Sequence, residues 1–144
     1  MHTRDQRVDA LGKVPLLAGL SKRDRARILR LGKEVEFLPG EVIVSAGDTA
    51  RDFYLILRGK GDLNVPGIRR DTLGPGAYFG EITVLDGGPR TATVTAQGHV
   101  SALRIDGKDF VGLLDRYGSI GRKILVEMTK RVRRAESKAA GARS

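Results

Sequence analysis

Two charged side chains close together in the sequence, Glu81 and Arg90, are the best candidates for chemistry in this chain. Glu81 follows Gly80, and a glycine lets the backbone approach a ligand closely. The free N–H groups that open the next turn attract an anion. Arginine grips a phosphate through two parallel hydrogen bonds, and a carboxylate accepts from a sugar hydroxyl. The set suits a ligand that carries a phosphate and a sugar hydroxyl, and it contains no catalytic group.

Each of the two residues also has a simpler explanation. The helix dipole alone favours an acid such as Glu81 in the first turn of a short helix. Arg90 follows Gly87-Gly88-Pro89, which is typical of a surface loop. An arginine at the mouth of a strand that runs inward points to the interior, however, where a charge needs a partner. We therefore favour a phosphate ligand for Arg90.

The apolar pattern predicts helices at both ends of the chain and short strands between them. Ser21 is positioned to cap a helix from Lys22 to about Leu31, and a longer helix capped by Ser119 carries an apolar stripe from Ile120 to Val132. We expect residues 1–10 to fray. The middle alternates β-rich runs with Gly, Pro and Asp, which indicates an antiparallel sandwich or barrel; the runs are 35–38, 41–44, 53–57, 61–65, 69–73, 91–95 and 100–105.

The segment 79–94 resembles the phosphate-binding cassette of the cyclic-nucleotide-binding domain family, as in catabolite activators and protein kinase A regulatory subunits. Its parts are Phe79 to Leu85, a spacer at 86–88, and Pro89 to Val94. Further similarity lies at 39–43, 46–48 and 53–59, so the resemblance covers roughly Leu11 to Arg134. It implies a mainly β fold with flanking helices, namely an antiparallel eight-stranded jelly roll with an N-terminal helix and two C-terminal helices.

The resemblance also implies roles for individual residues. Arg90 would pair with the cyclic phosphate and Glu81 with the ribose 2′-hydroxyl. The remaining contacts would come from the backbone or side chains of Gly80, Ile82, Thr83, Thr91 and Ala92.

The sequence indicates the base of the ligand less clearly than its phosphate and its ribose. The resemblance permits both cAMP and cGMP, because the family varies at the position of Thr91, and it slightly favours cAMP. In the family the last helix covers the base, and three of its residues are within reach by position: Val126, Lys130 and Arg131.

We expect a single domain over 8–138, with an N-terminal helical segment at 8–33, the jelly roll at 34–106 and C-terminal helices at 107–138. A disordered tail would follow at 139–144. The apolar stripe of the last helix packs on the roll or pairs with a second copy.

Composition narrows the function further. The chain has 144 residues, no cysteine and two histidines, which leaves no clustered metal site, and we expect no cofactor. No apolar run reaches the length of a membrane span, and we expect a cytoplasmic protein. The net charge of +9 is concentrated at both ends, at 1–33 and 116–144. Such flanks are most often solvated helix faces, although they can meet nucleic acid, lipid or an acidic protein.

These observations predict a non-enzymatic cyclic nucleotide sensor that rearranges its C-terminal helices and acts on a protein effector or a further domain. Two alternatives stay open: an interaction module that has lost its ligand, and the sensor part of a larger transcription regulator, channel or kinase. No helix-turn-helix follows the last helix, so sequence-specific DNA binding by this chain is not expected.

Overall fold

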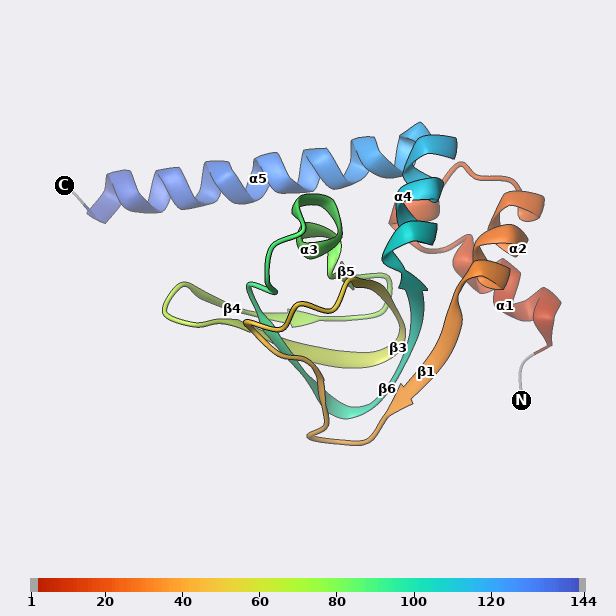
Figure 1. Cartoon of the computed structure of the whole chain (residues 1–144), viewed down its shortest axis with the longest axis horizontal. Coiled ribbons are helices and arrows are strands. Elements are labelled where there is room, and N and C mark those ends of the chain that lie inside the picture. Colours follow the sequence, from red (N-terminus) through yellow and green to blue (C-terminus); the bar gives the residue numbers. More distant parts are fainter. Residues whose placement is uncertain (1–2, 143–144) are drawn as a thin grey trace.

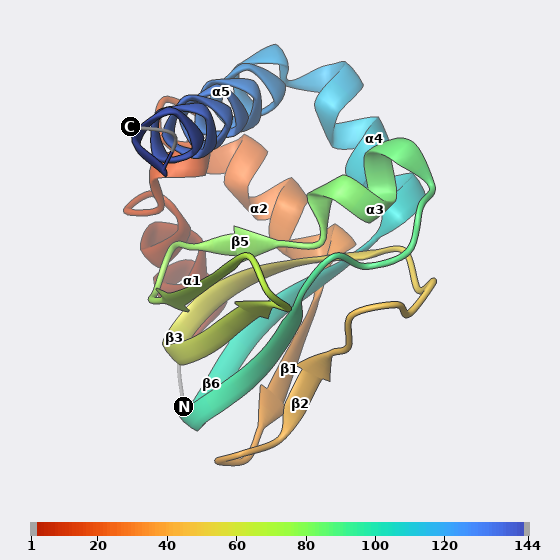
Figure 2. The same ribbon diagram turned by 90° about the vertical axis from the view of Figure 1, so that its left-hand side faces the viewer.

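A computed structural model describes residues 3–142 and shows an antiparallel β-roll with helices gathered on one side (Figures 1 and 2). The strands form one sheet in the order β1-β6-β3-β4, with β2 paired to β6 and β5 paired to β3. All pairings are antiparallel. The strands are β1 (Lys33–Phe37), β2 (Val42–Val44), β3 (Asp52–Val65), β4 (Arg69–Leu73), β5 (Tyr78–Phe79) and β6 (Thr93–Asp106). The predicted class, a mainly antiparallel β fold with flanking helices, is confirmed.

The number of separate strands differs from the expected eight. The runs expected at 53–57 and 61–65 form the single strand β3, and β6 joins most of 91–95 to 100–105. The joints contain Gly59 and Gly98, both with positive φ, at 83° and 85°. Glycine adopts this conformation without steric cost, so each strand bends while its hydrogen bonding continues. The register between β3 and β6 shifts beside Gly59.

Helices cover the open side of the roll, and α5 lies along its top (Figure 1). Ser21 caps α2 as expected, since its Oγ accepts from the Asp24 N–H at 3.1 Å. Asp106 caps α4 in the same way. The helices are α1 (Arg4–Leu11), η1 (Pro15–Leu17), α2 (Lys22–Leu31), α3 (Glu81–Asp86), α4 (Gly107–Arg116) and α5 (Gly118–Ala142). The last helix thus begins one residue before the expected cap at Ser119.

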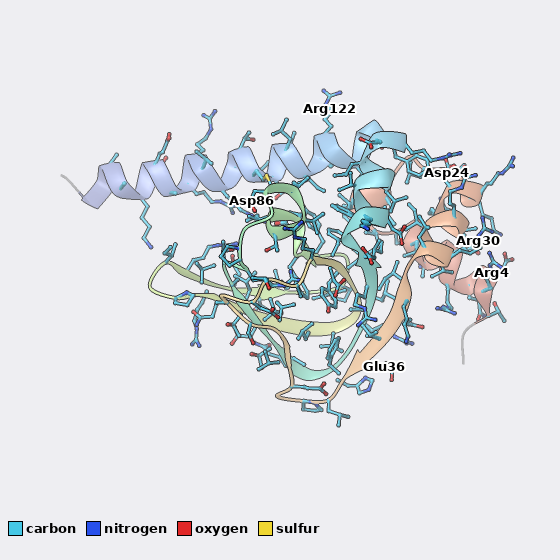
Figure 3. All side chains as sticks on the ribbon, in the orientation of Figure 1. Arg4, Asp24, Arg30, Glu36, Asp86 and Arg122 are labelled. Atoms are coloured by element: carbon cyan, nitrogen blue, oxygen red, sulfur yellow. The ribbon has the colours of Figure 1, made fainter. Side chains whose placement is uncertain are left out.

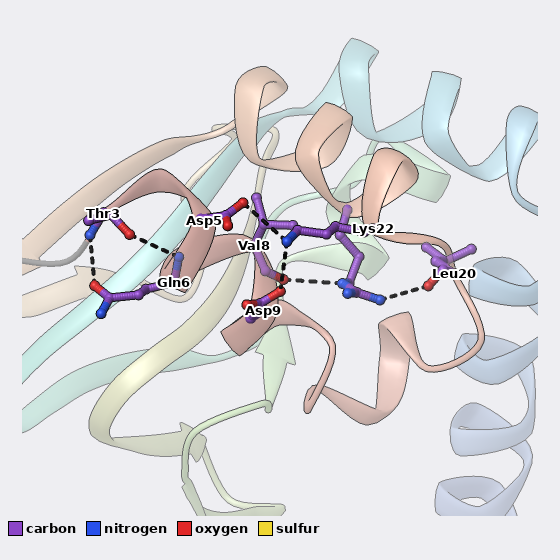
Figure 4. A network of polar contacts seen from close by, with 8 residues as sticks. Thr3, Asp5, Gln6, Val8, Asp9, Leu20 and Lys22 are labelled. Carbon is purple, nitrogen blue, oxygen red and sulfur yellow. Dashed lines mark hydrogen bonds and ion pairs between the residues drawn. The ribbon is translucent and has the colours of Figure 1, made fainter.

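The expectation that residues 1–10 fray is wrong for the described residues 3–10. Thr3 and Gln6 form a reciprocal capping box that fixes the first turn of α1. Lys22 of α2 lies 3.2 Å from Asp5 and 3.6 Å from Asp9 (Figure 4). Val8 and Leu11 are buried beneath these contacts. The polar composition of the segment concealed the two apolar positions, one helical turn apart, that anchor it.

Two apolar clusters hold the roll and the helices together. One lies between the roll and the helices, and there Phe53 of β3 stacks on Phe110 of α4 with ring centroids 3.9 Å apart. The other fills the inside of the roll, where Tyr54 stacks on Phe79 at 5.0 Å. Because Phe53 and Tyr54 are adjacent and face opposite sides of β3, this strand joins the two clusters.

Only the first turns of α5 are anchored in the core. Ile120 and Ile124 are 1% and 3% exposed, whereas Val132 is 56% exposed. The helix nevertheless continues through Ala142, where we expected a disordered tail from 139, because alanine is the strongest helix former. Residues 143 and 144 of that tail lie outside the described part. Within residues 3–142, no helix is both long and apolar enough to cross a membrane. Figure 3 shows Arg122 of α5 pointing away from the roll.

Candidate ligand-binding site

The turn between β5 and α3 brings the backbone close to the start of β3. Gly80 has φ of 95°, in the left-handed region that other residues rarely adopt. A Cβ atom on Gly80 would collide with the carbonyl oxygen of Asp52 and approach the Arg90 guanidinium. The first N–H groups of α3 have no acceptor within the helix. Both the conformation and the space at this turn therefore require glycine.

Arg90 lies buried at the end of the loop that leads into β6. It is 5% exposed, and its Nη2 donates to the Asp52 carbonyl oxygen at 2.9 Å. Its guanidinium lies 5.9 Å from the centre of the Tyr54 ring. Its Nε is buried with no hydrogen-bond partner in the described part of the chain, and none of the ion pairs found there includes Arg90. A buried cation without a counter-charge is costly, and an anionic ligand would remove that cost.

Glu81, the first residue of α3, is 3% exposed. Its Oε1 accepts from Nη1 of Arg131 on α5 at 3.3 Å. Its Oε2 is buried and has no partner within residues 3–142. One oxygen thus holds the last helix, and the other remains free to accept a hydrogen bond.

These residues line a cavity of about 360 Å³ between the roll and α5. That volume lies within the range of small-molecule sites, about 300–1,000 Å³. All of the predicted ligand residues lie around it: Gly80, Glu81, Ile82, Thr83, Arg90, Thr91 and Ala92. The structure therefore brings the whole predicted set together, and the contact of each with a ligand stays a prediction.

Of the three α5 candidates, only Arg131 lines the cavity. Val126 is 45% exposed, and Lys130 pairs with Glu127 at the surface. Sequence reasoning missed Glu127 and Arg134, which also line the cavity. Spacings of four and three residues place Glu127, Arg131 and Arg134 on one helix face. That face continues the buried stripe of Ile120 and Ile124. Extending their four-residue spacing along the helix would have predicted that these three residues face the body of the protein.

The sequence analysis also did not predict that β4 and β5 form part of the cavity wall. Arg69, Asp71 and Leu73 of β4 line the cavity, as does Tyr78 of β5. The Tyr78 hydroxyl is buried without a partner in the described residues. Burial, and next the negative charge of Glu81, raise the pKa of Tyr78 to about 12. Tyr78 therefore stays neutral at physiological pH.

Comparison with known proteins defines the class of this site. The cyclic nucleotide-binding domain family matches residues 34–117, more than half of the chain. The chain belongs to this family, and residues 34–117 form a cyclic nucleotide-binding domain.

Two curated relatives illustrate the match. The chain is 36% identical over 129 residues to a Rhodopseudomonas palustris protein named "Putative potassium channel protein", covering 86% of this chain and 31% of the relative. It is 33% identical over 115 residues to the cAMP-dependent protein kinase regulatory subunit of Emericella nidulans, covering 78% of this chain and 28% of that subunit. The chain thus spans about a third or less of the length of these relatives.

Solved structures agree on the fold. A domain described as "Sp-2Cl-cAMPS bound to PKAR CBD2" superposes with a TM-score of 0.80 at 24% identity, over 95% of this chain and 91% of that one. The Thermus thermophilus catabolite activator protein superposes with a TM-score of 0.76 at 27% identity, over 88% of this chain and 62% of that one. The match therefore covers only part of the second protein.

Proposed function

We propose that this chain is a cAMP sensor that binds the nucleotide without converting it and passes the binding event on through α5. The cyclic phosphate occupies the space between the Gly80–Thr83 turn and the Arg90 guanidinium. The observation that carries the proposal is the buried Arg90 side chain, which lacks a counter-charge among the described residues and has an unpartnered Nε. A phosphate diester supplies both the negative charge and the acceptor oxygens.

The sugar side of the ligand lies at Glu81. Its free Oε2 accepts from the ribose 2′-hydroxyl, while Oε1 keeps its contact with Arg131. Ile82, Thr83, Thr91 and Ala92 complete the contact with the phosphate and ribose through their backbone or, for the two threonines, their hydroxyl groups. The relatives named as cAMP-dependent regulatory subunits support cAMP over cGMP as the ligand.

Signalling follows from the position of α5. This helix covers the cavity through Glu127, Arg131 and Arg134, but none of its residues from 125 to 141 is buried. A ligand held at Glu81 and Arg90 favours the state in which α5 lies close to the cassette. A protein effector, or a further domain such as those of the longer relatives, would respond to that shift in the cytoplasm.

A second candidate function is self-association through α5. Leu125 and Val132 are 61% and 56% exposed and stand seven residues apart, on one side of the helix. Apolar residues seven positions apart are typical of a coiled-coil seam. Light scattering of the parent and of Leu125→Lys tests it: a dimer that becomes a monomer supports pairing, and a monomeric parent contradicts it.

A thermal unfolding series tests the sensor proposal. We expect cAMP at a hundredfold excess over its Kd to stabilise the chain by about 2.7 kcal/mol, which corresponds to a rise in Tm of several degrees. Linear 5′-AMP should produce a much smaller rise, because its phosphate has a different shape and charge. If neither cAMP nor cGMP raises the Tm, the ligand-free interaction module becomes the better account.

A further inference from the structure

An oppositely charged pair on β4, Arg69 and Asp71, lies in the cavity and has no role in the phosphate or ribose contacts described above. Arg69 Nη1 donates to Asp71 Oδ2. Alternate residues of a strand share a face, and Arg69, Asp71 and Leu73 all line the cavity. Arg70 and Thr72, on the other face of β4, do not line it. The alternation of β4 therefore turns both side chains of the pair toward the cavity.

The register of β3 places this pair away from the phosphate end of the cavity. Arg90 bonds to Asp52, the first residue of β3. Asp71 pairs with Leu63, and Arg69 pairs with Val65, the last residue of the same strand. Leu63 also pairs with Val94 of β6, and both side chains are buried and line the cavity. An apolar floor thus connects the Arg90 end to the charged pair.

We propose that the Arg69–Asp71 pair reads the edge of the purine base and makes the site selective for adenine over guanine. The inference rests on the proposed function, since it takes the phosphate and ribose to be held at Arg90 and Glu81. A base attached to that ribose extends along the floor formed by Leu63 and Val94. Its 6-substituent then reaches β4, where Asp71 lies.

The chemistry of the two bases gives the direction of the selectivity. Adenine carries an amino group at position 6, which donates, whereas guanine carries an oxygen, which accepts. An ionised carboxylate only accepts. Because Arg69 occupies Oδ2 of Asp71, Oδ1 is left to accept from the adenine amino group. At the same point guanine presents its 6-oxygen, and two acceptors repel; the guanine donors, N1–H and the 2-amino group, lie further along the edge of the base.

Without its partner, Arg69 would favour guanine, and the ion pair with Asp71 suppresses that preference. A free guanidinium at this edge would donate to the guanine 6-oxygen. Paired with Asp71, it instead fixes the carboxylate in the orientation that adenine requires. The side chain of Asp71 is 52% exposed, so water competes and the selectivity is moderate.

Calorimetric Kd values for cAMP and cGMP, measured on the parent and on three variants, test the inference. We expect Asp71→Ala to shift the ratio of the two Kd values toward cGMP by about tenfold, equivalent to ~1.4 kcal/mol, because it removes the acceptor and frees Arg69. Arg69→Ala should retain the preference for cAMP. Arg70→Ala, a matched arginine on the outer face of the same strand, should leave both values unchanged.

A second probe separates base contact from a structural effect. Purine riboside 3′,5′-cyclic phosphate lacks the 6-substituent, so it should bind the parent more weakly than cAMP does, while Asp71→Ala should bind the two equally. If Asp71→Ala binds both nucleotides with an unchanged ratio, the inference is overturned and the proposed function stands. If the parent binds neither nucleotide, the proposed function itself fails.

Discussion

Arg131 of α5 and Glu81 of α3 lie 3.3 Å apart, Nη1 to Oε1, and so connect the last helix to the phosphate-binding turn. The side chain of Glu81 is 5% exposed and that of Arg131 is 31% exposed, which makes this pair the most buried ion pair found among the described residues. Beyond Ile124 this contact is the main polar attachment of α5 to the body. The ion pair is therefore positioned to control how closely α5 lies over the cavity.

We expect Arg131→Ala to release the distal half of α5. The change leaves a buried carboxylate without its partner, which costs about 1–3 kcal/mol, and it should speed hydrogen exchange of backbone amides from Glu127 onward. Lys130→Ala is the matched control, because Lys130 pairs with Glu127 at the surface and does not line the cavity. Equal exchange rates in the two variants would show that the ion pair does not hold α5.

Oε2 of Glu81 has no partner among the described residues, so we expect the ribose 2′-hydroxyl of the ligand to contribute to its affinity. We expect 2′-deoxy-cAMP to bind the parent about tenfold more weakly than cAMP, since a hydrogen bond to a charged group is lost. Glu81→Ala should bind the two ligands equally. Asp115→Ala, which changes an exposed carboxylate of α4 that does not line the cavity, should preserve the tenfold difference. A difference that survives in Glu81→Ala would place the 2′-hydroxyl elsewhere.

Gly80 should be more sensitive to substitution than a glycine with a similar positive φ elsewhere. Gly80→Ala combines an unfavourable positive φ with a collision against the Asp52 carbonyl oxygen. Gly40 also has a positive φ, 82°, but has open space around its Cβ position. We expect Gly40→Ala to cost about 1 kcal/mol of unfolding free energy and Gly80→Ala clearly more. Chemical denaturation measures both, and equal losses would contradict the close approach seen at this turn.

The raised pKa of Tyr78 predicts how the free energy of unfolding changes at high pH. Its pKa rises from 10.0 to about 12 on folding, chiefly because the hydroxyl is buried. Between these values the folded state holds the proton and the unfolded state releases it, so stability falls as pH rises from about 10 to about 12. Tyr78→Phe should show a smaller fall over that range.

At neutral pH the same substitution should be neutral or slightly stabilising. The Tyr78 hydroxyl has no partner among the described residues, so removing it relieves a desolvation cost. Denaturation series at neutral and alkaline pH measure both effects. An identical alkaline decline in parent and variant would show that Tyr78 does not titrate in this way.

Much of the site could be predicted from the sequence because its residues are close together in the chain. Gly80 to Thr83 and Arg90 to Ala92 belong to one turn and one loop, so their types and spacing describe a local shape. The buried position of Arg90 followed from the inward strand that comes after it. All of these residues meet at one cavity.

The remaining cavity residues depend on long-range pairing that spacing alone does not reveal. Asp71 faces the cavity because β4 pairs with the far half of β3, and Arg131 reaches Glu81 across 50 positions of the chain. The joining of strands at Gly59 and Gly98 also escaped prediction, because glycine usually marks a turn and here bends a continuous strand. The capping box at Thr3 was local, but the polar composition around it hid the helix.

Calorimetric titration of the purified chain with cAMP, run in parallel on Arg90→Ala, tests the central claim most directly. Arg30→Ala, which changes an arginine of α2 away from the cavity, serves as the control for charge (Figure 3). Loss of a charge-assisted hydrogen bond is worth about 1.5–3 kcal/mol, so we expect Arg90→Ala to weaken binding by about ten- to a few-hundredfold and Arg30→Ala to leave it unchanged. Binding of cAMP to Arg90→Ala with the parent affinity would contradict the assignment of the phosphate to Arg90.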